Sequence, residues 1–230
     1  MPQKQTFSYK DLFSRPHLVS LVTALIMLGT AYIAAHFAYI YAAEYSVRPT
    51  TRYVGDLFLD NLPIVDLNFL IIETALIAFV SSIAYMLYHP RSILFSLKAL
   101  ALFVAIRAIF ISLTHLGVYP GQLYPGDGFF DSIYVFLNLQ SGFFFSGHTG
   151  LPFLAAMIFW DHRLARSAFL VLTAVFAVSM LLVRAHYSID VFAAPFMAYG
   201  IFGLTRYLFP RDYALSGAQF VEPSDIPKPE

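Results

Sequence analysis

The sequence predicts an all-α polytopic membrane protein, a six-transmembrane-helix bundle with both termini in the cytoplasm. Of its 230 residues, 59% are hydrophobic and only 12% are charged, and the mean hydropathy is +0.68. An ordinary soluble domain is about 45–50% apolar, so this chain is too apolar to be one. Six apolar stretches follow one another, and a helix needs about 20 such residues to cross a bilayer. One membrane domain should therefore occupy nearly the whole chain.

The six predicted spans lie at 18–43, 67–88, 92–117, 149–160 with a backward extension through the aromatic stretch 133–145, 167–183 and 189–209. The fourth is the weakest of the six. Gly and Pro punctuate the connections, which is typical of turns. We expect three parts: a cytoplasmic N-terminal segment at 1–17, a catalytic membrane domain at 18–210, and a flexible cytoplasmic tail at 211–230 that is polar and rich in proline.

The basic residues are distributed unequally between the two sets of loops, and this indicates orientation. One set holds Lys4, Lys10, Arg15, Arg91, Arg163, Arg166, Arg211 and Lys228, whereas the other holds Arg48, Arg52 and Arg184. Because Lys and Arg are retained in cytoplasmic loops, both termini are expected in the cytoplasm. His148 and His186 then lie at the exoplasmic face. A short chain with small loops favours a bacterial inner membrane over the Golgi membrane.

Composition also excludes several classes of function. The formal net charge is zero, with 14 basic and 14 acidic residues, so no basic surface for nucleic acid is expected. The chain has no cysteine, which excludes disulfides, thiolate metal sites and cysteine nucleophiles. No cofactor is expected. The partners implied are the bilayer itself and lipid substrates, and the oligomeric state is not predicted.

The stretch "HYSID" at 186–190 places a histidine and an aspartate four residues apart. On a helix such residues share a face, so the Asp190 carboxylate can accept a hydrogen bond from Nδ1 of His186. This contact fixes the tautomer and leaves Nε2 free as a nucleophile or base. It also stabilises the cation that forms when Nε2 bonds to an electrophile. We therefore predict His186 as a nucleophile and Asp190 as its orienting partner.

The stretch "SGHTG" at 146–150 has the residues of an anion-binding turn. Gly147 lets the backbone approach a ligand closely, Ser146 can donate to an anionic oxygen, and amides at the start of a helix favour negative charge. His148 can then protonate a leaving oxygen or activate an acceptor. Two histidines, one aspartate and an anion-binding turn are typical of phosphoryl transfer.

At each of these positions an interpretation without any catalytic role competes with the functional one. Interfacial histidines are usually amphipathic surface residues, and this interpretation is applied to His17, His36, His89, His115 and His162. For His148 and His186 we favour a catalytic role, because their two polar turns are expected at the same membrane face. The alternative for these two and Asp190 is a metal site with two histidines and one carboxylate, which we rank lower, so that no metal is expected.

A charged residue inside a predicted span costs free energy unless it is paired with an opposite charge or hydrated. Glu73 and Arg107 could form an ion pair, or Glu73 could tune the histidines while Arg107 binds phosphate; both interpretations stay open. Arg184, two residues before His186, is a candidate phosphate clamp. Lys98 is nearer the cytoplasmic end, so we expect its ammonium to extend to the interface and leave it outside the site.

The two histidine motifs resemble those of a known family. "SGHTG" and "HYSIDV" are similar to the Ser-Gly-His-Thr and His-Tyr-Thr/Ser-x-Asp-Val motifs of the sphingomyelin synthase branch of the type 2 phosphatidic acid phosphatase superfamily. Looser similarity is found in "NLPIVD" at 61–66, "RAIFISLTHLGVYPG" at 107–121 and "TRYLF" at 205–209. The family carries Cys-Gly-Asp shortly before the first histidine motif, where Gln140, Ser141 and Gly142 stand here, so one carboxylate is missing.

The resemblance implies a six-span lipid phosphotransferase whose triad corresponds to His148, His186 and Asp190. Such an enzyme moves a phospho-head-group from a glycerophospholipid to a lipid alcohol such as ceramide through a phosphohistidine intermediate, and it releases diacylglycerol. If water is the acceptor, the same site is a lipid phosphatase or phospholipase C. A non-catalytic lipid transporter or scaffold is the alternative from another class.

Overall fold

The computed structural model describes residues 7–48, 50–113, 115–123, 126, 128–136 and 143–218. Within these residues the chain is helical and contains no strand. The all-α class expected from the sequence is therefore confirmed for the described part. Gln140, Ser141 and Gly142, where the carboxylate of the family motif is missing, lie outside the described residues.

The helices of the described part follow one another with short or irregular connections. They are α1 (Tyr9–Leu12), α2 (Arg15–Ser46), α3 (Asn68–Tyr88), the short 3₁₀ turn η1 (Pro90–Ser92), α4 (Ile93–Leu113), α5 (Phe129–Phe136), α6 (Gly147–Ile158), α7 (Arg163–Leu182), α8 (Ser188–Leu208) and α9 (Pro210–Ser216).

Five of these elements are long and apolar enough to cross a membrane: α2, α3, α4 with the preceding η1, α7 and α8. They coincide with five of the six predicted spans, so a polytopic membrane protein is supported. The fourth predicted span corresponds to α6, which has 12 residues and is about 18 Å long at 1.5 Å per residue. That is shorter than the hydrocarbon core of about 30 Å.

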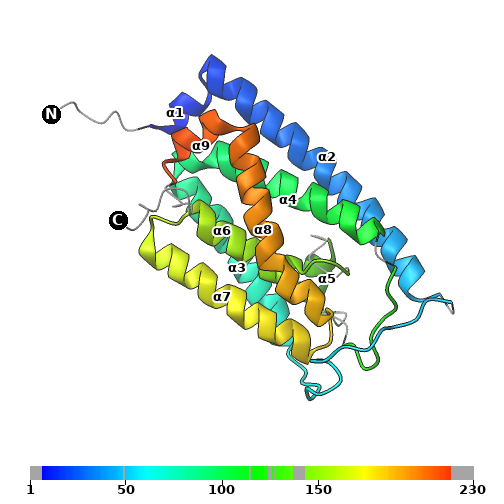
Figure 1. Cartoon of the computed structure of the whole chain (residues 1–230). Coiled ribbons are helices and arrows are strands. Elements are labelled where there is room, and N and C mark those ends of the chain that lie inside the picture. Colours follow the sequence, from blue (N-terminus) through cyan, green and yellow to red (C-terminus); the bar gives the residue numbers. More distant parts are fainter. Residues whose placement is uncertain are drawn as a thin grey trace, which may run out of the picture.

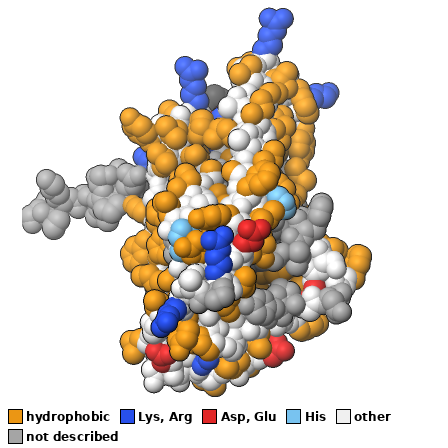
Figure 2. Space-filling view, turned by 90° about the vertical axis from the view of Figure 1, so that its right-hand side faces the viewer, with side chains coloured by type: hydrophobic (Ala, Val, Ile, Leu, Met, Phe, Trp, Pro, Cys, Tyr) orange, Lys and Arg blue, Asp and Glu red, His pale blue; other side chains and the backbone are white. Residues whose placement is uncertain are grey.

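Helices α4, α7 and α8 pack against the short α6, and α2 packs against α4. Figure 1 shows α2 alongside α4 on one side of the bundle and α7 on the opposite side, with α6 and α8 between them. Hydrophobic side chains cover most of the face drawn in Figure 2, as expected where lipid is the solvent.

Two hydrophobic clusters hold the bundle together. One joins α4, α6 and α8 around large buried side chains, which include Phe95, Phe103, Phe145, Leu154 and Met157. The other lies where α7 turns into α8 and packs against α3, with members that include Ile71, Ile72, Met180, Val183 and Tyr187. The polar N-terminus of α6 lies where these clusters meet, since Phe145 belongs to one and Phe143 to the other.

A buried ion pair fastens the C-terminal helix at the opposite end of the bundle. Lys98 of α4 does not extend to the interface as expected; it is only 4% exposed and contacts the Asp212 carboxylate of α9. Ser20 of α2 donates to both oxygens of Asp212, and Lys98 donates to Ser20 at 2.7 Å. The residues at 211–216, expected in a flexible tail, are therefore helical and docked, because Asp212 supplies the counter-charge that a buried lysine needs.

Asp212→Ala should lower the free energy of unfolding in detergent by about 3–5 kcal/mol, because it leaves Lys98 as an uncompensated buried charge. Arg211→Gln, at the exposed neighbouring position, serves as the control and should change the stability by no more than about 0.5 kcal/mol. Thermal unfolding of the two variants beside the wild type measures this. Equal stability of Asp212→Ala and the control would contradict a stabilising role for the pair.

Candidate functional site

The two histidine motifs lie at the first turns of α6 and α8, and the backbone joins them directly. The amide of Ser146, which precedes α6, donates to the carbonyl of Asp190 in the first turn of α8 at 3.0 Å. Both residues are fully buried. The two stretches that the sequence separates by a helical hairpin therefore form one cluster.

His186 and Asp190 make the contact that their spacing predicts. His186 Nδ1 lies 3.3 Å from Asp190 Oδ2, and the same oxygen accepts the amide of Tyr187 at 3.1 Å. His186 itself precedes α8, so the contact joins a loop residue to the first helical turn. A carboxylate in this turn is also favoured by the positive end of the helix. Asp190 thus orients the imidazole and is itself held in place.

The opposite nitrogen of His186, Nε2, does not take part in that contact. His186 Nε2 is buried and unpaired among the described residues, as is Asp190 Oδ1. Burial lowers the pKa of His186, against the raising effect of the Asp190 carboxylate. The imidazole is therefore neutral at physiological pH, which is the form in which Nε2 has a free lone pair.

The N-terminus of α6 gathers groups that favour an anion. Ser146 is the N-cap, and its hydroxyl accepts the amide of Thr149 at 3.4 Å. Arg107 of α4 donates from Nε to the Phe145 carbonyl at 2.9 Å. Its guanidinium lies against Gly147, where an added Cβ would be only 3.4 Å from Nε. A cation and a helix N-terminus thus meet at one point, and both attract negative charge.

His148 lies in the first turn of α6 and is held on two sides. Its Nε2 is hydrogen-bonded to the hydroxyl of Tyr134 from α5, and the two rings are stacked with centroids 5.6 Å apart. Phe176 of α7 contacts the imidazole edge to face. His148 is also within electrostatic reach of His186 and Arg107. Tyr134 is 3% exposed; sequence reasoning placed it only in an aromatic stretch, because no local pattern indicates a partner 14 residues away.

Arg184 connects loops in this structure. Its Nη1 donates to the Pro120 carbonyl at 2.7 Å and its Nη2 to the Leu59 carbonyl at 2.9 Å, while the guanidinium packs on the ring of Tyr119. A phosphate contact by Arg184 stays a prediction. Its observed contacts fasten two loops to the α7–α8 turn.

The same two loops, at 50–67 and 115–123, are bonded to the α7–α8 turn that carries His186, and together they are called the cover of this site. The hydroxyl of Tyr187 donates to the Gly117 carbonyl at 2.8 Å and accepts the amide of Val54 at 3.4 Å. Leu182 and Val183 accept amides of Val65 and Leu123 at 3.1 and 3.0 Å. His186, in the turn to which these loops are bonded, is fully buried.

Asp56 is a further anchor of the cover that sequence reasoning missed. Its carboxylate accepts the amide of Ser188 at 2.7 Å, and those of Phe58 and Leu59 within its own loop. Burial raises the pKa of Asp56, but these three amides outweigh burial and hold it below its usual range. Asp66, in the stretch that resembles the family's first-loop motif, instead accepts the amide of Asn68 at the start of α3.

Glu73 lies on α3 and does not join the cluster through any contact between described residues. Its Oε2 is buried and has no hydrogen-bond partner among the described residues. Within the described part no ion pair links Glu73 to Arg107, which instead contacts Phe145. Of the two interpretations that the sequence leaves open, direct pairing is therefore not observed. The role of Glu73 in tuning the histidines stays a prediction.

Metal binding has no support in the arrangement of ligands. Among the described residues no group of three or more His, Asp or Glu side chains is placed to hold a metal ion. His148 Nε2 is occupied by Tyr134 and His186 Nδ1 by Asp190. The cluster brings an oriented imidazole, that of His186, together with Arg107 and the N-terminus of α6, two groups that favour an anion.

No family model, no curated protein and no solved structure matches this chain.

Gly150→Ala should destabilise the protein, because the new Cβ would lie 2.8 Å from the buried ring of Phe103 and push α6 away from α4. Gly203→Ala is the matched control, since nothing lies within 4 Å of its added Cβ and alanine is the better helix former by about 1 kcal/mol. Melting temperatures in one detergent compare them. A Gly150→Ala protein as stable as Gly203→Ala would show that this close approach is not required.

Proposed function

We propose that this chain is a membrane lipid phosphotransferase of sphingomyelin-synthase type. It transfers a phospho-head-group from a glycerophospholipid to a lipid alcohol such as ceramide and releases diacylglycerol. The observation that carries the proposal is His186 Nε2, buried and unpaired, on an imidazole that Asp190 orients. The motifs around His148 and His186 resemble that family, and the contacts between them support the same chemistry.

The proposed topology has six crossings with both termini cytoplasmic and the site at the exoplasmic face of a bacterial inner membrane. Helices α1 and α9 lie at the same end of the bundle, where Leu12 and Leu215 share a cluster with Ile93 and Leu94 (Figure 1). An even number of crossings returns the chain to its starting side. The five long helices then need one more pass, which the stretch containing α6 supplies.

The reaction proceeds in two displacements. His186 Nε2 attacks the phosphorus of the donor, and the bond between phosphorus and the diacylglycerol oxygen breaks. His148, whose protonated form the phosphate anion of the bound donor stabilises, gives its proton to that oxygen, so diacylglycerol leaves as the neutral alcohol. His148 then takes the proton of the acceptor hydroxyl; the acceptor oxygen bonds to phosphorus, the P–N bond breaks, and His186 is restored.

The surrounding residues stabilise the charges of these steps. Arg107 and the first amides of α6 face the phosphoryl oxygens, and Asp190 balances the positive charge that His186 gains. Exclusion of water by the cover favours an alcohol acceptor over hydrolysis. These roles need only groups of the chain itself.

His186→Ala and Asp190→Asn should abolish or strongly reduce head-group transfer, the latter by at least about a hundredfold, because it removes the charge that orients and balances His186. The assay uses purified protein in liposomes with fluorescent ceramide and phosphatidylcholine or phosphatidylethanolamine, and products are identified by mass spectrometry. Asp161→Asn, the same change at an exposed carboxylate between α6 and α7, should leave the rate unchanged.

The products separate the proposal from its alternatives. A phosphosphingolipid that disappears in His186→Ala supports transfer and names the donor. Diacylglycerol without such a lipid would replace transfer by hydrolysis, as in a lipid phosphatase or phospholipase C. Full activity of His186→Ala would refute the role of His186, and lipid movement without any product would favour a transporter.

Tyr134→Phe should lower kcat about tenfold and shift the pH dependence of kcat, with KM nearly unchanged. The variant keeps the stacked ring but loses the hydroxyl that bonds to His148 Nε2, so the imidazole loses the partner that selects its protonated nitrogen. Tyr207→Phe, at an 81% exposed position, is the control. An unaltered pH profile in Tyr134→Phe would limit the contact to a structural role.

A further inference from the structure

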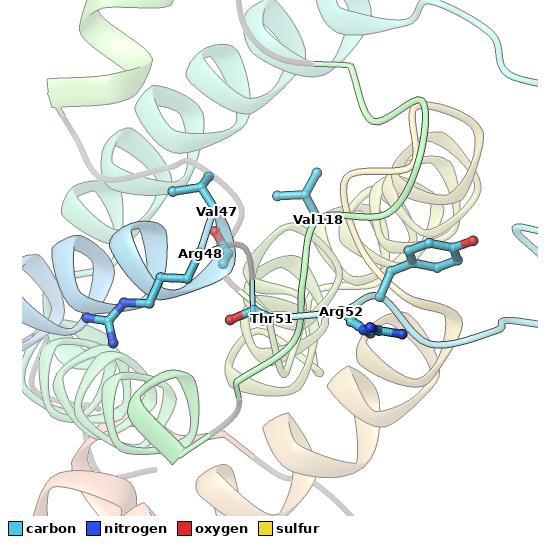
Figure 3. Close-up of a pocket in the computed structure, with 7 residues that line it drawn as sticks. Val47, Arg48, Thr51, Arg52 and Val118 are labelled. Atoms are coloured by element: carbon cyan, nitrogen blue, oxygen red, sulfur yellow. The ribbon is translucent and has the colours of Figure 1, made fainter.

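A second polar site lies at the same end of the bundle as His186. An open hollow of about 620 Å³ is lined by residues that follow α2 and by one residue of the 115–123 loop: Ser46, Val47, Arg48, Thr51, Arg52, Tyr53 and Val118. Its volume lies within the roughly 300–1,000 Å³ of small-molecule sites. Figure 3 shows Arg48 and Arg52 extending to opposite sides of it, with Thr51 between them and Val47 and Val118 on a third side.

The charge of this hollow is positive. Among the described residues neither Arg48 nor Arg52 forms an ion pair with a carboxylate, although Glu44 lies one helical turn before Arg48. Arg48 packs over the ring of Tyr45, 4.7 Å from its centroid. Both arginines are exposed, so their long side chains can turn towards an anion. Guanidinium groups bind phosphate with two parallel hydrogen bonds.

The surroundings of Arg48 are those of a membrane interface. Tyr45 stacks on His115 with centroids 3.8 Å apart, and Tyr41 is hydrogen-bonded to the same imidazole at 2.9 Å. Aromatic side chains of this kind gather at the level of lipid head groups. The arginines, which follow them along the chain, are thus at the height where lipid phosphates lie.

The hollow is continuous with the cover of the candidate site. The amide of Gly117 donates to the Arg52 carbonyl at 3.2 Å, and an added Cβ on Gly117 would be 2.8 Å from Arg52. The carbonyl of the same Gly117 accepts the hydroxyl of Tyr187, the neighbour of His186. The segment that carries Arg52 is therefore one backbone contact away from the loop beside the histidine.

We infer that this hollow binds the phosphate of a phospholipid head group at the membrane surface, outside the candidate catalytic site. Arg48 and Arg52 bind the phosphate oxygens, the Thr51 hydroxyl donates to one of them, and Val47 and Val118 contact the glycerol end. Such a site concentrates phospholipid beside the cover of His186. The shared chemistry is a phosphate anion, which a lipid or free phosphate can supply.

Binding is measured with the full chain in detergent, in a His186→Ala background, so that it does not depend on the proposed reaction. The probes are dihexanoylphosphatidylglycerol, dihexanoylglycerol and inorganic phosphate, and microscale thermophoresis gives the Kd values. Arg48→Gln with Arg52→Gln should raise the Kd of the phosphatidylglycerol at least about tenfold, because charge-assisted hydrogen bonds are lost. Dihexanoylglycerol, which lacks the phosphate, should bind all variants equally weakly.

The matched control removes two exposed arginines at the other end of the bundle, Arg163→Gln with Arg211→Gln, and should leave the Kd unchanged. Competition by inorganic phosphate at similar concentration would support the site and identify free phosphate as its ligand; lipid binding without such competition would support it with the head group as ligand. Equal Kd values for the two double variants would overturn the inference. Unchanged melting temperatures establish that both variants are folded.

Discussion

The hydrogen bond from the Ser146 amide to the Asp190 carbonyl is the constraint on which the candidate site depends. It joins the starts of α6 and α8 inside the bundle, where an unpaired backbone group would be costly. Phe145, whose carbonyl Arg107 contacts, and His148 lie close to Ser146 along the chain, and His186 lies four residues before Asp190. Two helix N-termini are thereby brought to one point, and their positive ends favour the phosphate that the proposed reaction needs.

The buried polar groups around this cluster need hydrogen-bond partners, and the loops supply several of them. Arg184, Tyr187 and Asp56 direct their hydrogen bonds to the backbone of the 50–67 and 115–123 loops or of the α7–α8 turn. The loops are therefore bonded to the turn that carries His186, which is itself fully buried. Among the described residues two buried side-chain nitrogens lack a hydrogen-bond partner, Arg184 Nε and His186 Nε2; the second is the atom that the proposed chemistry requires. In the proposed reaction, substrate reaches His186 only when these loops move, because the imidazole is fully buried.

The charged residues inside the bundle have different surroundings at its two ends. Away from the site, Lys98, Asp212 and Ser20 satisfy one another and dock α9, which is a stabilising arrangement. At the site, Arg107 approaches Gly147 and the N-terminus of α6 and lies within electrostatic reach of Asp190. A guanidinium beside a helix N-terminus favours the anionic substrate of the proposed reaction, and Arg48 and Arg52 carry the same preference to the proposed phosphate site at the surface.

The sequence alone determined the helical membrane class, five of the long helices and the contact between His186 and Asp190, because these depend on hydropathy over about 20 residues and on a spacing of four. It also identified Ser146, Gly147 and His148 as the residues of a helix start. Tertiary structure decided the contacts between distant segments. Tyr134 is hydrogen-bonded to His148, Asp56 accepts the amide of Ser188, and Arg184 donates to the loop backbone. Lys98 is paired with Asp212 and does not extend to the interface. Contacts between residues far apart in the chain leave no periodic signal, since they arise only when the packing of whole helices brings two positions together.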